Sequence, residues 1–215
     1  MFVKICGITR VSDAQVAAAC GASAIGFIFW PKGKRWVEPD VARAIARSLP
    51  PFVTPVGVFV DETVERMNEI ATFVGLGAIQ LHGAEQPDIV DRLVRPVVKA
   101  VGRIDASRIG EWPARVTMLV DAPDPVNHGG TGARADWAGA ARLAAVRRTI
   151  LAGGIRPENV VEAVTTVRPF GIDVASGVED APGIKNPDRI RDLFDALRAV
   201  PRSDDSREAR ELRAR

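Results

Sequence analysis

The chain has 215 residues, 47% of them hydrophobic and 26% charged, and its 29 basic and 27 acidic side chains leave a formal net charge of +2. This length suits one sizeable α/β domain. A nearly balanced charge creates no strong field, which argues against nucleic acid or an anionic membrane as a partner, and no apolar stretch reaches the roughly 18 residues of a membrane span. The two cysteines form no Cys-x-x-Cys pair and the N-terminus shows no signal-peptide pattern, so we expect a reduced, cytoplasmic protein.

Short apolar runs rich in β-branched residues recur along the chain, at residues 2–6, 24–29, 55–60, 78–81, 97–101, 116–120, 149–151 and 171–174. They are continuous rather than alternating, which is typical of strands covered on both faces of a parallel sheet. Helical patterns separate them at residues 11–20, 39–48, 63–74, 157–165 and 186–200, more weakly at 86–94 and 136–143, and least clearly at 104–112. Pro39 suits a first helical turn, and Asp61 is expected to cap the helix that follows it.

Strand and helix repeated eight times predict an α/β fold of one domain, a (β/α)8 TIM barrel over residues 1–200. The alternative is an open doubly wound sheet, and the absence of Gly-x-Gly-x-x-Gly after the first run disfavours it. Residues 201–215 mix Arg with Asp and Glu, and we expect a charged tail that is disordered or frayed.

In such a barrel the reactive groups lie at the carboxyl ends of the strands and in the loops that follow them. Cys6 ends the first run, where its thiol is equally well interpreted as a base or nucleophile and as a small buried hydrophobe. Asp121 ends the sixth run, and burial there favours the protonated carboxyl that a general acid near neutral pH requires. Cys20, on a helix, fits a buried role, and Asp124 is a lower-ranked competing acid in the loop after Asp121.

Basic and amide side chains follow the second, fourth and fifth runs. Arg35 lies in a basic loop, residues 30–36, where a guanidinium can hold a carboxylate through two hydrogen bonds, whereas Lys32 and Lys34 are better interpreted as solvated. His82 is as compatible with a structural role as with a catalytic one. Lys99 can point into the barrel or onto a helix.

Two loops predict an anion site. Gly153 and Gly154 follow the seventh run, and Ser176 and Gly177 follow the eighth, where small residues let backbone N–H groups approach a ligand. Asp173, within the eighth run, is expected to face the pocket and contact sugar hydroxyls. The glycine-rich loop 122–132 is expected to close over the substrate as a lid.

The ordered set of these motifs resembles the phosphoribosylanthranilate isomerase family over residues 1–200. The matching segments are Lys4-Ile5-Cys6-Gly7-Ile8-Thr9, Gly26-Phe27-Ile28-Phe29 with Arg35, Gln80-Leu81-His82-Gly83, Leu119-Val120-Asp121, Gly129-Gly130-Thr131-Gly132, Leu151-Ala152-Gly153-Gly154-Ile155 and Ser176-Gly177-Val178-Glu179.

The resemblance implies a TIM barrel that converts N-(5′-phosphoribosyl)anthranilate to 1-(2-carboxyphenylamino)-1-deoxyribulose 5-phosphate in tryptophan biosynthesis. It places the general base on Cys6, the general acid on Asp121 and the anthranilate carboxylate on Arg35. It implies no metal and no organic cofactor, and a phosphorylated small molecule as the ligand of a monomer or a homodimer.

Two alternatives remain at this stage. A related sugar-phosphate barrel, such as the histidine-pathway isomerase or a dual-substrate version, shares the fold but carries Asp at the end of the first strand, where this chain has Cys6. A catalytically silent barrel that only binds a phosphorylated ligand or a protein would not need both Cys6 and Asp121.

Overall fold

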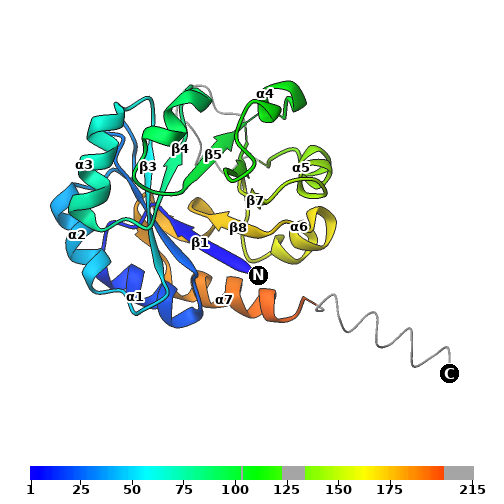
Figure 1. Cartoon of the computed structure of the whole chain (residues 1–215). Helices are drawn as coiled ribbons and strands as arrows, with labels where there is room; N and C mark the ends of the chain where they lie inside the picture. Colours follow the sequence, from blue (N-terminus) through cyan, green and yellow to red (C-terminus); the bar gives the residue numbers. More distant parts are fainter. Residues whose placement is uncertain (103, 123–133, 201–215) are drawn as a thin grey trace.

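The computed structural model describes residues 1–102, 104–122 and 134–200 and confirms the predicted (β/α)8 barrel (Figure 1). Neighbouring strands pair in parallel, and the last strand returns to pair with the first. The barrel strands are β1 (Phe2–Cys6), β2 (Ala24–Ile28), β3 (Thr54–Phe59), β4 (Ala78–Leu81), β5 (Val97–Val101), β6 (Thr117–Val120), β7 (Thr149–Leu151) and β8 (Gly171–Val174).

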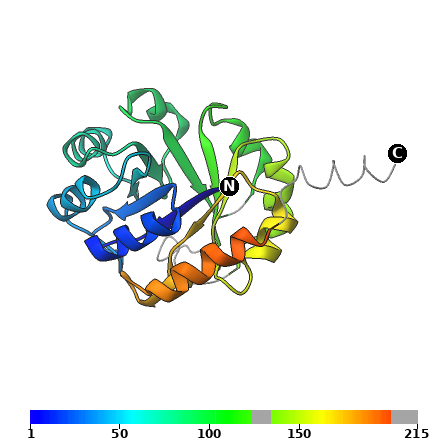
Figure 2. The same cartoon turned by 90° about the horizontal axis from the view of Figure 1, so that it is seen from below.

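Helices surround the strands on the outside of the barrel, as Figure 2 shows from below. They are α1 (Val11–Cys20), α2 (Pro39–Arg47), α3 (Val64–Val74), α4 (Ala106–Gly110), α5 (Trp137–Ala144), α6 (Val160–Val167) and α7 (Pro187–Arg198), with short 3-10 helices η1 (Pro87–Arg92) and η2 (Ser176–Val178). Pro39 begins α2, as predicted. The weak helical pattern at 86–94 forms η1 rather than an α-helix, and the segment predicted at 157–165 becomes helical only from Val160.

Both faces of the strands are buried, which explains why the apolar runs do not alternate. Val3 and Ile5 of β1 belong to the large core between strands and helices, together with Ala14 and Ala17 of α1. The intervening Lys4 and Cys6 therefore face the barrel interior, because successive side chains of a strand point to opposite faces. A second, smaller apolar cluster consists of Ala100, Leu119, Ile150 and Ala152 from β5, β6 and β7 and the residue after β7.

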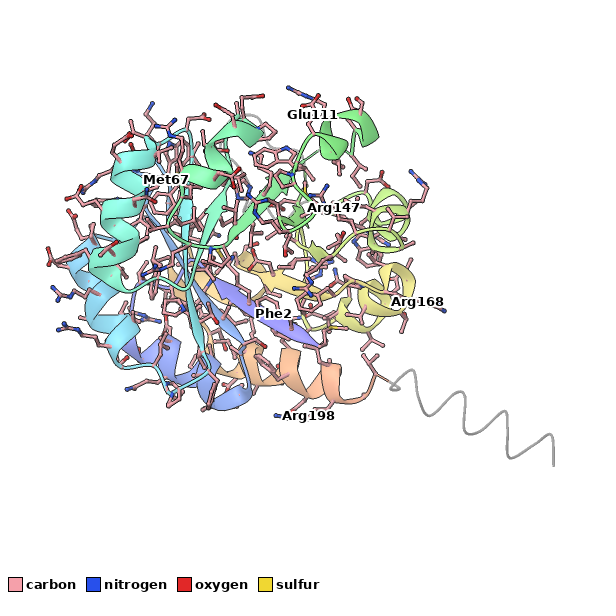
Figure 3. All side chains as sticks on the ribbon, in the orientation of Figure 1. Phe2, Met67, Glu111, Arg147, Arg168 and Arg198 are labelled. Carbon is pink, nitrogen blue, oxygen red and sulfur yellow. The ribbon has the colours of Figure 1, made fainter. Side chains whose placement is uncertain are left out.

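Buried side chains fix the helices against the strands. Met67 of α3, labelled in Figure 3, is fully buried beneath its helix. Arg147, also labelled, donates hydrogen bonds to the backbone carbonyls of Ile109, Trp112 and Val116, and burial lowers the pKa of its guanidinium. These bonds tie the segment around α4 to the start of β7.

Two local features differ from expectation. Asp61 does not cap α3: Thr63 does, by accepting a hydrogen bond from the backbone N–H of Arg66. Asp61 adopts a left-handed backbone (φ 50°) and its Oδ1 accepts from the N–H of Ala84, 2.6 Å away, so its carboxylate serves the loop after β4 instead. The second feature is an unpredicted hairpin, β9 (Glu179–Ala181) with β10 (Ile184–Lys185), between η2 and α7.

Several expectations fall outside the described residues, namely the tail 201–215, Asp124 and most of the proposed lid, residues 123–132. Among the residues that the structure does describe, no helix combines the length and apolar character needed to cross a membrane.

Candidate active site

Cys6 lies at the carboxyl end of β1, buried beside an ammonium group. Lys4 is on the same face of β1 two residues earlier, and its Nζ lies 2.8 Å from Oδ2 of Asp173 on the neighbouring strand β8. On the other side of β1, Cys6 pairs with Gly26 of β2. A Cβ at Gly26 would lie 2.8 Å from Sγ of Cys6 and 3.0 Å from Cε of Lys4, so this glycine leaves the space that both side chains occupy.

Burial is the largest single influence on the pKa values of both Cys6 and Lys4. Burial raises the pKa of the Cys6 thiol, and the Lys4 ammonium acts in the opposite direction. Burial disfavours the Lys4 ammonium as well, but the negative charges of Asp173 and of an ionised Cys6 together outweigh burial and raise the pKa of Lys4 above its usual value. Lys4 therefore remains charged next to the thiol. Oδ1 of Asp173 is buried and has no hydrogen-bond partner among the described residues, which leaves it available to a ligand hydroxyl.

Asp121 follows β6 across the barrel from Cys6. Its Oδ1 accepts the backbone N–H of Ala122 at 2.7 Å, and its Oδ2 lies 3.5 Å from Nε2 of His82 at the end of β4. The other ring nitrogen of His82, Nδ1, lies 3.1 Å from Nε2 of Gln80. The structure thus brings His82, which sequence interpretation left open, into contact with the predicted acid.

Arg35 is buried and held by a carboxylate. Its Nε and Nη2 both donate to Glu179, the Nη2–Oε2 distance being 2.7 Å, and Lys185 donates to the same carboxylate from 2.7 Å. Burial alone would raise the pKa of Glu179, but Arg35 and Lys185 hold it below its usual value. Burial in turn lowers the pKa of Lys185, and Glu179 opposes that shift. The hydrogen bonds described for Arg35 leave Nη1 unused, so one edge of the guanidinium remains for a further acceptor.

The predicted anion loops pack directly on each other. Gly153 and Gly154 both have left-handed backbones (φ 76° and 66°), and Asn159 accepts from the N–H of Arg156 and donates to the carbonyl of Gly154. A Cβ at Gly177 would overlap the backbone carbonyl of Ile155. The loop after β8 can therefore approach the loop after β7 only because position 177 carries no side chain.

Gly177→Ala is expected to separate these two loops. Overpacking against backbone should destabilise the protein by about 1–3 kcal/mol and raise KM for a phosphorylated ligand more than it lowers kcat. Gly110→Ala is the matched control, because its Cβ would meet no atom within 4 Å and its φ is not positive. Urea unfolding and steady-state kinetics on both variants test this expectation; equal stability of the two variants would contradict the packing described here.

The remaining candidates lie away from this cluster. Lys32 and Lys34 are exposed, as predicted, and Cys20 is partly buried on α1. Lys99 faces outward toward Trp112 and pairs with Glu85 at 2.7 Å, which places it among the helices rather than in the barrel. Among the described residues no group of three or more His, Cys, Asp or Glu side chains is arranged to hold a metal ion.

Sequence interpretation missed two participants. Lys4 was treated only as part of a motif, although a lysine inside an apolar strand must find a partner when buried. Glu179 was likewise noted only within a motif, and its partner Arg35 is 144 residues away in sequence. No local pattern joins such a pair.

Known proteins are similar to this chain over nearly the whole barrel. A family profile described as N-(5′-phosphoribosyl)anthranilate (PRA) isomerase matches residues 3–196. The N-(5′-phosphoribosyl)anthranilate isomerase of Syntrophus aciditrophicus (strain SB) is 44% identical over 200 residues, which is 91% of this chain and 86% of that protein.

Solved structures show the same similarity. A phosphoribosyl anthranilate isomerase from Thermus thermophilus superposes with a TM-score of 0.86 at 42% identity, covering 94% of this chain and 100% of that one. A second such isomerase, in complex with reduced 1-(o-carboxyphenylamino)-1-deoxyribulose 5-phosphate, gives a TM-score of 0.81 at 37% identity and covers 93% and 100%.

Proposed function

This chain belongs to the N-(5′-phosphoribosyl)anthranilate isomerase family, and we propose that Cys6 and Asp121 perform the general base and general acid steps of that reaction in it. The enzyme converts N-(5′-phosphoribosyl)anthranilate to 1-(2-carboxyphenylamino)-1-deoxyribulose 5-phosphate, an Amadori rearrangement in tryptophan biosynthesis. The observation that carries the assignment is the placement of a buried thiol and a buried carboxyl at the ends of β1 and β6, on opposite sides of one barrel mouth.

The acid step opens the ribose ring. Asp121 donates a proton to the ring oxygen as the C1′–O bond breaks, and the anilino nitrogen supplies the electron pair that forms a C1′=N iminium. Oδ1 of Asp121 already accepts a backbone N–H, which leaves Oδ2 as the oxygen that carries the proton. His82 lies next to Oδ2 and restricts the orientation of that carboxyl.

The base step follows on the other side of the sugar. The iminium makes the C2′ proton acidic; the Cys6 thiolate forms an S–H bond as the C2′–H bond breaks, and the electron pair passes into a C1′=C2′ enolamine. Protonation at C1′ and loss of the hydroxyl proton then give the ketone. In each step the protein groups only donate or accept protons, so an acid and a base flanking one sugar are sufficient.

Three further contacts orient the substrate in this proposal. Arg35 receives the anthranilate carboxylate on the guanidinium edge that Glu179 leaves open. The loops bearing Gly153, Gly154, Ser176 and Gly177 receive the phosphate through backbone N–H groups. The unpaired Oδ1 of Asp173 accepts a hydrogen bond from a sugar hydroxyl.

Substitutions of Arg35 and Glu179 are expected to weaken substrate binding more than they slow the chemical steps. Arg35→Met should raise KM by roughly 10–100-fold with a smaller change in kcat, because one charge-assisted contact is lost. Glu179→Gln should raise KM by a smaller factor, since Arg35 stays but loses its two-oxygen partner. Arg66→Met, in an exposed pair with Glu69, is the control and should match the parent. Steady-state kinetics that put the Arg35 effect in kcat alone would contradict this binding role.

A cytoplasmic location belongs to the proposal as well. Its support is the tryptophan-biosynthetic reaction, whose phosphorylated substrate is a small soluble metabolite, and the two unpaired cysteines, both free thiols in the structure.

Turnover tests the function directly. Phosphoribosylanthranilate is made in situ from anthranilate and phosphoribosyl pyrophosphate, and loss of its fluorescence is followed against spontaneous hydrolysis. Fast enzyme-dependent loss without release of anthranilate is the expected result. Loss no faster than the background would overturn the proposal.

A further inference from the structure

Lys4 is a buried cation that neither proposed step uses. Its side chain is 2% exposed, and an ammonium group is costly to remove from water unless a partner compensates. Asp173 supplies that partner at 2.8 Å. Replacing both by apolar groups would fill the same barrel layer without this cost, so the pair calls for a reason beyond packing.

The ammonium end of Lys4 lies next to the thiol. Lys4 and Cys6 share the inward face of β1, and both reach the space left by the missing side chain of Gly26, with Cε and Sγ at 3.0 and 2.8 Å from the position of its absent Cβ. No neighbour on β2 competes for this space, because Gly26 is the residue paired with Cys6.

We propose that Lys4 is a positioning residue whose ammonium, held by Asp173, stabilises the thiolate of Cys6 and so makes a buried thiol usable as the base. The proposal rests on the function assigned to Cys6 above. When the thiolate takes the C2′ proton, the negative charge leaves sulfur and the Lys4–Asp173 pair remains; when the proton is released after turnover, the ammonium again favours the thiolate.

The charges around Cys6 determine whether each substitution raises or lowers the pKa of its thiol. Burial raises the pKa of the thiol; Lys4 on the same strand opposes this, Asp173 on β8 adds to it, and Lys185 on β10 opposes it more weakly. Lys185 is already bound by Glu179 at 2.7 Å, whereas Lys4 shares the inward face of β1 with the thiol and its Cε reaches the same space beside Gly26. Removing Lys4 should therefore raise the titration midpoint of Cys6, and removing the charge of Asp173 should lower it.

The thiolate can be observed without turnover. Cys6 and Cys20 are the two cysteines of the chain, so a Cys20→Ala background leaves Cys6 as its single thiol, and the absence of tyrosine removes the usual interfering alkaline absorbance. Ultraviolet thiolate absorbance is followed against pH in this background and in its Lys4→Met, Lys4→Arg and Asp173→Asn derivatives. Circular dichroism at each pH shows that the protein remains folded.

We expect Lys4→Met to move the midpoint upward by roughly 1–3 pH units, Asp173→Asn to move it downward, and Lys4→Arg to stay near the parent. The low-pH limb of kcat/KM, which reports the free enzyme, should move by the same amount for Lys4→Met, and on that limb kcat/KM at a fixed pH should fall about tenfold for each unit. An unchanged midpoint in Lys4→Met, or shifts of the same sign in Lys4→Met and Asp173→Asn, would overturn the proposal. Failure of the proposed function would show separately, as a parent without turnover.

Discussion

Cys6→Ala is expected to lower kcat by about 10²–10⁴-fold, the range that a positioned general base contributes. The thiol is the group at the end of β1 that can accept the C2′ proton in the proposed reaction, and alanine accepts none. The substitution removes one sulfur from a buried site and keeps β1 and its pairing with β2 and β8. Steady-state turnover and thermal unfolding measured together separate the loss of the base from a loss of fold.

The matched control for this variant is Cys20→Ala. Cys20 is the other cysteine, partly buried at the end of α1 and remote from the strand ends that carry the site. It should keep parental kinetics. A Cys6→Ala variant that keeps full turnover while folded would remove Cys6 from the mechanism.

Asp121→Asn is expected to lower kcat by a similar factor, about 10²–10⁴-fold. The amide has nearly the same shape and keeps an oxygen for the N–H of Ala122, but it cannot deliver a proton to the ring oxygen. Because asparagine carries no acidic proton at any pH, this loss should not be relieved by raising the pH, whereas Lys4→Met should recover at alkaline pH, where its Cys6 ionises. Turnover measured across a range of pH distinguishes the two.

An exposed carboxylate provides the control for Asp121. Asp195 on α7 is largely exposed and pairs with Arg198 on the same helix turn, so Asp195→Asn should leave kcat and KM unchanged. If Asp121→Asn behaved like Asp195→Asn, the acid would have to be sought elsewhere in the barrel mouth.

Strand ends were predictable from sequence because a local rule governs them. Continuous apolar runs mark strands buried on both faces, and the fold rule then selects the polar residue at each carboxyl end, which makes Cys6 and Asp121 candidates. The loops with Gly153 and Gly177 followed from the same rule. Their direct packing, which requires glycine at 177, depends on the pairing of β7 with β8 and is not local.

What sequence could not supply is the set of partners between distant segments. Lys4 meets Asp173 only because β8 closes the barrel against β1 in one register. Arg35 meets Glu179 only because an unpredicted hairpin follows η2. Asp61 shows that a local rule can also mislead. Its position before a helix suggested a helix cap, but its left-handed backbone directs the carboxylate to the N–H of Ala84.

The assignment of Cys6 as the base that removes the C2′ proton is tested most directly by an isotope effect. Substrate deuterated at C2′ is compared with unlabelled substrate in the parent, in Cys6→Ala and in Asp121→Asn. In Cys6→Ala proton removal becomes the slow step, so a normal primary isotope effect on kcat larger than that of the parent is predicted, while Asp121→Asn, slowed at ring opening, should show no such increase. Residual turnover of Cys6→Ala without an isotope effect would contradict the role given to Cys6.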